Sequence, residues 1–92
     1  MSTVIVIFDV PGMTAAQYDQ VMKDLEAAGA GSPQGRQAHY AASKAGGWLV
    51  VDIWDSPDTL NQFAPTLMPI LAKNGVTPPQ PQVYPAHNLV FA

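Results

Sequence analysis

The sequence predicts a single α+β domain whose elements follow the order β-α-β-β-α-β. Three observations carry this prediction: a run rich in Val and Ile near the N-terminus, two stretches with helical hydrophobic spacing, and two strand-like runs around Ala45-Gly46-Gly47. A chain of 92 residues makes one domain, and such a domain buries about 60–65% of its unfolded surface. We therefore expect residues 1–92 to form a four-stranded antiparallel sheet with two helices on one face.

The first strand and the first helix have clear boundaries in the sequence. The strand is expected over Thr3–Val10, where Val and Ile dominate until Pro11-Gly12 ends the run. Thr14 and Gln17 have the spacing of a capping box, so the helix should begin there. Gly29 is a natural end for it. Its apolar residues recur with the period of a helix that is buried along one side: Tyr18, Val21, Met22, Leu25 and Ala28.

The middle of the chain predicts a β-hairpin and a second helix. Arg36–Ser43 and Trp48–Asp55 are the two runs on either side of the glycine-rich turn. Ser56 can cap the helix, and Pro57 suits its first position because a backbone N–H has no partner there. The apolar stripe of this helix consists of Leu60, Phe63, Leu67 and Leu71.

Prolines interrupt the second half of the chain. Pro65 and Pro69 fall inside the second helical pattern. A proline in a helix interior removes a hydrogen bond and clashes with the preceding turn, at about 3 kcal/mol each. We therefore expect a kink, or a break into two short helices, between Ala64 and Pro69. The last strand is expected over Val83–Phe91, with Pro85 restricting part of it to a sheet edge or a bulge.

Composition and charge exclude several classes of protein. The net charge is −3 and the four basic residues are scattered, so neither nucleic acid nor an anionic membrane is an expected partner. The apolar run Val4–Phe8 is too short to be a signal or membrane segment. With no cysteine there is no disulfide framework, zinc–thiolate site or thiol nucleophile, and a cytoplasmic location is expected. Two histidines on separate strands are too few for a metal site.

The third strand is apolar on both of its faces. One face carries Leu49, Val51 and Ile53, and the other carries Trp48, Val50, Asp52 and Trp54. Two helices can cover only one face of the sheet, and an exposed apolar sheet face usually marks an interface. Charged residues make up 12% of the chain, against about 25% in a typical protein. Both observations predict a homodimer, or a higher oligomer built from it.

Asp52 is a charged residue in the middle of this apolar strand, so it needs a partner. The candidates are His39, Tyr40 and Arg36. An imidazole oriented by a partly buried carboxylate suits general base catalysis. The alternatives are a purely structural His–Asp pair and a histidine that faces solvent.

The turn of the hairpin decides which partner Asp52 has. A two-residue turn at Ala45-Gly46, or a four-residue loop around it, places His39 opposite Asp52. A two-residue turn one position later places His39 opposite Trp54. A three-residue turn pairs Tyr40 with Asp52 and turns His39 to the other face. Only in the first case do the two side chains lie about 4.5–5.5 Å apart at Cβ on one face.

Residues Gly47–Ser56 (GWLVVDIWDS), followed by Phe63 and the segment Leu67–Leu71, resemble the strand-to-helix passage of the dimeric α/β-barrel superfamily. Its antibiotic-biosynthesis-monooxygenase-like members are the most similar in length and element order. The resemblance implies two ferredoxin-like protomers packed sheet against sheet, with a cavity between each sheet and its helices. It also implies that Trp54 faces the helices while the opposite face forms the interface, through Leu49, Val51 and Ile53.

Members of this superfamily include cofactor-free oxygenases of aromatic or quinol substrates, haem-degrading enzymes, lactone isomerases and polyketide cyclases. Trp54 matches a tryptophan of the haem-degrading branch. That branch also uses an asparagine on the first strand and a histidine on the second helix. This chain has Asp9 near the first position and no histidine from Ser56 to Lys73, so haem is not expected, and neither is any other cofactor.

The resulting hypothesis is a cofactor-independent enzyme of the monooxygenase, isomerase or cyclase type. It would act on a planar aromatic, quinol or lactone-like substrate, with His39 and Asp52 as the catalytic pair. The expected substrate-binding residues are Trp54, Phe8, His87, Tyr40, Phe63 and Leu67. The alternatives are a non-catalytic small-molecule-binding module and a structural dimer whose aromatic residues are simply core. A cavity of a few hundred cubic ångströms would favour the first two.

Overall fold

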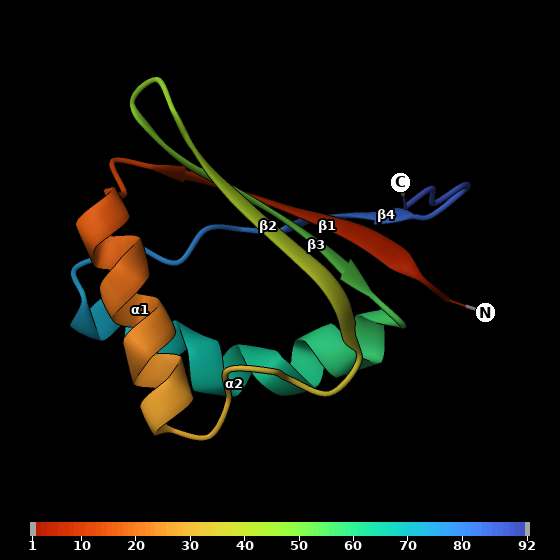
Figure 1. The fold of residues 1–92 in the computed structure, drawn as a ribbon, viewed down its shortest axis with the longest axis horizontal. Coiled ribbons are helices and arrows are strands. Elements are labelled where there is room, and N and C mark those ends of the chain that lie inside the picture. Colours follow the sequence, from red (N-terminus) through yellow and green to blue (C-terminus); the bar gives the residue numbers. More distant parts are fainter. Residues whose placement is uncertain (1, 92) are drawn as a thin grey trace.

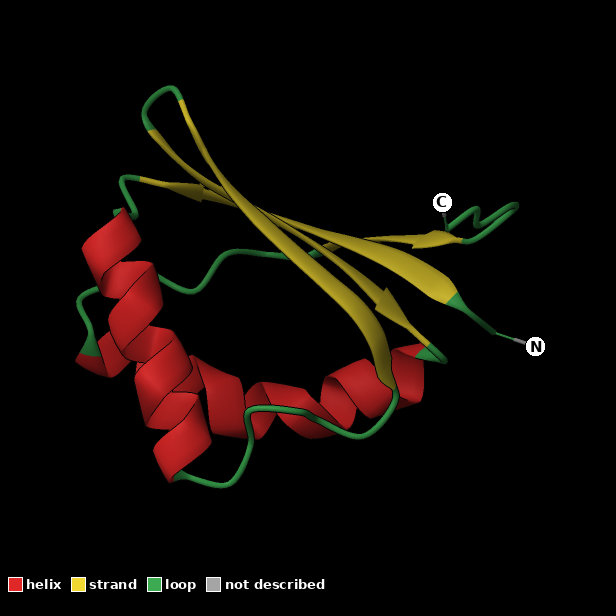
Figure 2. Ribbon diagram, viewed as in Figure 1, coloured by secondary structure: helices red, strands yellow, loops and turns green. Residues whose placement is uncertain are grey.

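The computed structural model describes residues 2–91, which form one four-stranded antiparallel sheet with both helices on the same face (Figures 1 and 2). The strand order is β2-β3-β1-β4, so β3 and β1 are central. Along the chain the elements are β1 (Val4–Pro11), α1 (Ala15–Ala27), β2 (Arg36–Lys44), β3 (Gly47–Trp54), α2 (Pro57–Lys73) and β4 (Gln82–Pro85). The predicted α+β fold and element order are confirmed.

The capping box at the start of α1 is present as predicted. The Gln17 backbone N–H donates to the Thr14 hydroxyl at 3.2 Å, and the Thr14 N–H donates to the Gln17 side chain at 3.0 Å. Val21 and Leu25 are fully buried in the core. Ala28 is exposed because it is the C-cap rather than part of the helix. Gly29 then adopts a φ of 73°, which reverses the chain toward the sheet.

Of the two alternatives predicted for the second helix, the break into two short helices is wrong, since α2 is continuous through Pro65 and Pro69. The kink stays a prediction. Both prolines lie on the exposed side of the helix, and so do Asn61 and Pro65, the residues whose carbonyls lose a donor. Water can therefore bind the freed carbonyls at small cost. The buried side, formed by Leu60, Phe63 and Leu71, keeps its packing and holds the helix together across both prolines.

The β2–β3 hairpin adopts one of the registers that the sequence allowed. Ser43 pairs with Trp48 across a two-residue turn at Ala45-Gly46. Gly46, the second central residue of this turn, has a φ of 77°, a conformation that favours glycine. In this register His39 lies directly opposite Asp52.

The last strand is much shorter than predicted. Instead of running from Val83 to Phe91, β4 ends at Pro85. Within residues 2–91 it pairs with β1 alone, and Pro85 lies opposite Val4, the first residue of that strand. Because β1 begins at Val4, it offers no further residues to pair with the described residues after Ala86.

The two faces of the sheet differ in their burial. On the helix side the central strands contribute Val4, Val6, Phe8, Val10, Val50, Asp52 and Trp54, all buried. On the other face Leu49 and Val51 are partly exposed, whereas Ile53 is buried. Trp54 therefore faces the helices, as the resemblance implied. Within residues 2–91, neither helix is long and apolar enough to cross a membrane.

Candidate functional site

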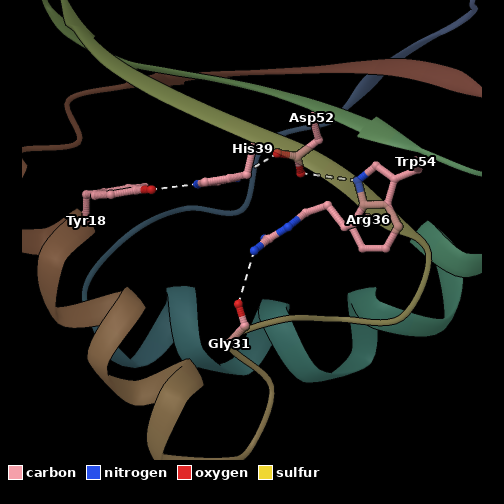
Figure 3. A network of polar contacts seen from close by, with 6 residues as sticks. All are labelled: Tyr18, Gly31, Arg36, His39, Asp52 and Trp54. Carbon is pink, nitrogen blue, oxygen red and sulfur yellow. Dashed lines mark hydrogen bonds and ion pairs between the residues drawn. The ribbon is translucent and has the colours of Figure 1, made fainter. Parts of the chain in front are cut away.

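Three side chains form a line of hydrogen bonds between the sheet and α1 (Figure 3). The Nδ1 atom of His39 lies 2.6 Å from Oδ1 of Asp52, and the Nε2 atom lies 2.6 Å from the hydroxyl of Tyr18. Asp52 comes from β3, His39 from β2 and Tyr18 from α1. A carboxylate, an imidazole and a phenol are thus joined by consecutive hydrogen bonds.

Asp52 is buried, and each of its two carboxylate oxygens has a hydrogen-bond partner. One oxygen faces His39, and the other accepts a bond from the indole Nε1–H of Trp54 at 3.2 Å. A buried carboxylate with no partner would be strongly unfavourable, and these two bonds offset that cost. Arg36, the third candidate partner, makes no ion pair with Asp52, since its guanidinium donates to the carbonyl of Gly31.

The partners of His39 determine which nitrogen carries hydrogen. An ionised carboxylate can only accept, so Nδ1 donates to Asp52. In the neutral imidazole Nε2 is then an acceptor, and the Tyr18 hydroxyl donates to it. This is the orientation of a general base: the carboxylate fixes the ring and would stabilise the imidazolium that forms when Nε2 takes a proton.

Tyr18 reaches this position from the apolar stripe of α1. Its ring lies 5.2 Å from that of Trp48, and its plane is nearly parallel to that of His39, at 7°. Burial raises the pKa of the Tyr18 hydroxyl, an effect that the positive charge of Arg36 partly opposes and the charge of Asp52 reinforces. The hydroxyl therefore stays protonated at neutral pH and acts as a donor.

A cavity of about 60 Å³ adjoins this line of side chains. Its polar wall consists of Tyr18, Arg36, His39 and Asp52. The rest of the wall is apolar: Phe8, Val10, Met13, Val21, Met22, Leu25, Val50, Phe63, Leu67, Leu71 and Pro79. Ligand pockets usually measure about 300–1,000 Å³, and a cavity of about 150 Å³ can hold benzene. The cavity is thus smaller than the sequence-based hypothesis required, and a ring can bind only if side chains move outward.

The predicted site residues fall into three groups. His39 and Asp52 form a hydrogen bond, and Phe8, Phe63 and Leu67 line the cavity beside them. Trp54 lies behind Asp52, fully buried, with its ring 5.6 Å from that of Phe63; it forms no part of the cavity wall.

Tyr40 and His87 lie outside this site. Tyr40 pairs with Val51 and is more than half exposed on the face away from the helices. His87 lies past the end of β4, in a surface depression beside Thr3. The structure does not bring either residue to the cavity.

Sequence reasoning missed the role of Tyr18, which was assigned only to the buried stripe of the first helix. The signal was its hydroxyl, because a buried tyrosine usually needs a hydrogen-bond partner. Arg36 was considered only as a partner for Asp52, although it reaches the cavity wall. No cluster of three His, Cys, Asp or Glu side chains in residues 2–91 has the arrangement needed for a metal ion.

Comparison with known proteins supports the fold. No family model matches the chain, and no relative was found among curated protein sequences. Solved structures are similar over nearly the whole length. A candidate antibiotic biosynthesis monooxygenase from Chloroflexus aurantiacus has a TM-score of 0.65 at 16% identity, covering 98% of each chain. A second, from Deinococcus radiodurans, has a TM-score of 0.66 at 16% identity, covering 97% of each chain.

A third similar structure is SnoaB, a cofactor-independent oxygenase from Streptomyces nogalater, with a TM-score of 0.65 at 15% identity over 96% of this chain and 95% of that one. The chain has the fold of the antibiotic-biosynthesis-monooxygenase-like proteins. The residues Gly47–Ser56 predicted this monooxygenase-like fold, and the prediction is confirmed. At these identities the likeness concerns the fold, so the chemistry has to be argued from the residues of this site.

Proposed function

We propose that the protein is a cofactor-independent enzyme that removes a proton from the hydroxyl group of a planar phenol or quinol. One observation carries the proposal: Nε2 of His39, oriented by Asp52, lies at a cavity and already forms a 2.6 Å hydrogen bond with a phenol, that of Tyr18. The position that the Tyr18 hydroxyl occupies is one where a substrate hydroxyl can be bound in the same way.

The proposed reaction begins with transfer of the substrate O–H proton to Nε2. Nδ1–H continues to donate to Asp52, whose negative charge stabilises the imidazolium. The resulting anion is electron-rich and can reduce molecular oxygen directly. For a quinol, one oxygen atom then enters the ring to give a hydroxyquinone and the other leaves as water. The same deprotonation without oxygen would start an isomerisation or a cyclisation.

The apolar wall would hold the ring. Phe8 and Phe63 supply aromatic surface, and Trp54 supports Phe63 from behind. Met22 and Leu67 line the cavity and are partly exposed, so they are the side chains expected to move when a ring binds. Tyr40 and His87 have no part in this proposal.

Oxygen uptake and product formation with a panel of hydroquinones and naphthols test the proposal. His39→Ala should lower the rate by about 10²–10⁴-fold while the circular dichroism spectrum stays native. His87→Ala is the matched control, because it removes a histidine outside the cavity, and its rate should equal that of the wild type. A His39→Ala variant with undiminished turnover would show that another group is the base.

A second candidate function is ligand binding without catalysis. It is favoured by the complete pairing of Asp52 and His39, which a non-catalytic network would also show. Calorimetry that detects binding of a phenol, together with no turnover by the wild type for any member of the panel, would support this alternative.

We also propose a homodimer formed through the sheet face opposite the helices. That face carries Leu49 and Val51, both partly exposed, and Tyr40, which is exposed. Val51→Asp would place a charge in the middle of this contact and should yield monomers or unfolded chain in sedimentation experiments. Val90→Asp changes an exposed residue beyond β4 and should leave the assembly unchanged. A stable wild-type monomer at micromolar concentration would refute the proposal.

A further inference from the structure

Arg36 places a positive charge at the wall of an apolar cavity, and the chemistry proposed above does not use it. In the described part of the chain its guanidinium makes one hydrogen bond, from Nη2 to the carbonyl of Gly31 at 3.1 Å (Figure 3). Within residues 2–91 no carboxylate lies within 4.0 Å of it. A guanidinium has five N–H donors, so most of its hydrogen-bonding capacity is open to a ligand.

An irregularity in β2 is what turns Arg36 toward the cavity. Side chains alternate along a strand, so Arg36 and His39, three residues apart, would normally point to opposite faces. The pairing shifts between Arg36 and Ala38: Arg36 lies opposite Trp54, and His39 lies opposite Asp52. This β-bulge takes up one extra residue and brings both side chains to the helix side of the sheet. Bulges commonly redirect a side chain beside an active site.

The backbone before Arg36 is fixed in place by Gly35. This glycine has a φ of 93°, and a Cβ added to it would lie only 2.5 Å from the Thr59 side chain of α2. Its carbonyl accepts a hydrogen bond from the Asp55 N–H at 2.8 Å. The start of β2 is therefore packed against both the end of β3 and the first turn of α2, and the position of Arg36 is defined by the fold.

The other three cations of the chain lie in different environments. Lys44 pairs with Asp9, and Lys73 lies 3.4 Å from Asp24. Lys23 is exposed on α1. The charge of Arg36, by contrast, partly opposes the rise that burial causes in the pKa of the Tyr18 hydroxyl, which itself bonds to Nε2 of His39.

We infer that Arg36 binds an anionic group on the ligand, so that the site takes hydroxylated aromatic acids. The ring would carry a hydroxyl group for Nε2 of His39 and a carboxylate for the guanidinium of Arg36. A carboxylate enters an apolar cavity only when a cation pairs with it there, and the planar guanidinium fits a carboxylate with two parallel bonds. The inference rests on the proposed function for the role of His39, whereas the carboxylate preference is a property of binding alone.

Calorimetry with two matched probes tests this preference. Gentisate is a hydroquinone ring with one carboxylate, and gentisamide is its uncharged amide of nearly the same shape. The wild type should bind gentisate about 3- to 30-fold more tightly at low salt, the usual difference between a hydrogen bond to a charged group and one to a neutral group. Equal affinity, tighter binding of the amide, or no binding of either probe at millimolar concentration would overturn the inference.

Three variants assign the preference to the guanidinium. Arg36→Gln should bind both probes equally, and Arg36→Lys should keep part of the preference because it keeps the charge. Lys23→Gln removes an exposed cation that does not line the cavity, and this variant should keep the full preference for gentisate. If Arg36→Gln has a native circular dichroism spectrum and still prefers gentisate, then Arg36 only fixes the Gly31 loop and the inference is wrong.

The inference and the proposed function fail in different ways. Turnover of uncharged hydroquinones with no preference for gentisate would refute the inference and leave the proposed enzyme standing. A gentisate preference that depends on Arg36, with no turnover of any quinol, would refute the enzyme and support the anion site.

Discussion

Two aspartates of the same sheet, Asp52 and Asp9, show how burial changes the meaning of an ion pair. Asp52 lies 2.6 Å from His39, and Asp9 lies 2.9 Å from Lys44. The distances are similar, but the Asp52 side chain is 5% exposed and the Asp9 side chain is 44% exposed. Water competes strongly for the second pair and reaches the first mainly through His39, whose side chain is 20% exposed. The surroundings of each pair, rather than its distance, therefore decide how much it contributes to stability.

The two aspartates also differ in how many hydrogen-bond partners they have. Asp9 and Lys44 bind each other at the surface, and an exposed pair of this kind contributes about 0–1 kcal/mol. Asp52 holds two donors, His39 and Trp54, and through His39 it is linked to Tyr18. Changes along this buried network should therefore have graded effects, and a change at Asp9 should have almost none.

Among these substitutions, Asp52→Ala is expected to cause the largest loss of stability. It leaves the Nδ1–H of His39 and the Nε1–H of Trp54 buried without an acceptor, at a cost of about 3–5 kcal/mol in the free energy of unfolding. Urea denaturation measures this loss. A cost below about 1 kcal/mol would mean that water replaces the carboxylate, and the contrast with Asp9 would disappear.

Trp54→Phe should lower the free energy of unfolding by about 2 kcal/mol, the next largest loss. It removes one of the two hydrogen-bond donors to Asp52 and reduces the volume of the core side chain. Trp48→Phe is a close control: the Nε1 of Trp48 is buried with no partner in the described part of the chain, so its removal breaks no hydrogen bond. Urea denaturation should show a clearly smaller loss for Trp48→Phe. Equal losses would indicate that packing alone, and not the bond to Asp52, makes Trp54 important.

Tyr18→Phe should cost about 1 kcal/mol at neutral pH, the usual value of one partly buried hydrogen bond. Its pH dependence is more informative. An unfolded tyrosine ionises near 10.0, and the raised pKa keeps Tyr18 protonated to higher pH in the folded state. The unfolded state thus loses its proton first, and stability falls as pH rises above that value. Tyr18→Phe should make this alkaline decline shallower.

The same variant separates two roles for the Tyr18 hydroxyl. If it only occupies the site of the substrate hydroxyl, Tyr18→Phe should bind phenols more tightly and turn them over as fast as the wild type. Turnover slowed by about two orders of magnitude or more would instead indicate that Tyr18 transfers the proton itself. Tyr84→Phe, at an exposed position on β4, should change neither binding nor turnover.

The smallest effect is expected for Asp9→Ala, at most about 1 kcal/mol at low salt and less at high salt, because the ion pair with Lys44 is exposed and screened. Urea denaturation at two salt concentrations checks this value. A loss as large as that of Asp52→Ala would show that distance alone predicts the strength of these pairs.

Features that depend only on neighbouring residues could be predicted from the sequence. Thr14 and Gln17 specify a cap within one turn of helix, and alternation along β3 places Asp52 and Trp54 on one face and Val51 on the other. The need of Asp52 for a partner also follows from local pattern, since a charge in an apolar strand cannot stay alone. These choices involve interactions over a few positions, and each residue type has few alternatives there.

Other features depend on packing between elements, because several local conformations of the chain have similar free energy there. Ala45-Gly46-Gly47 permits three turns, and packing of the sheet against the helices selects the one that unites His39 with Asp52. Pro65 and Pro69 would break an isolated helix, yet the buried side of α2 is stabilised by the core and the prolines are left in solvent. The partnership of Tyr18 with His39 and the bulge that turns Arg36 inward likewise join residues of different elements. A sequence pattern describes one element at a time, so contacts between elements, and with them the shape of the site, are set only when the chain folds.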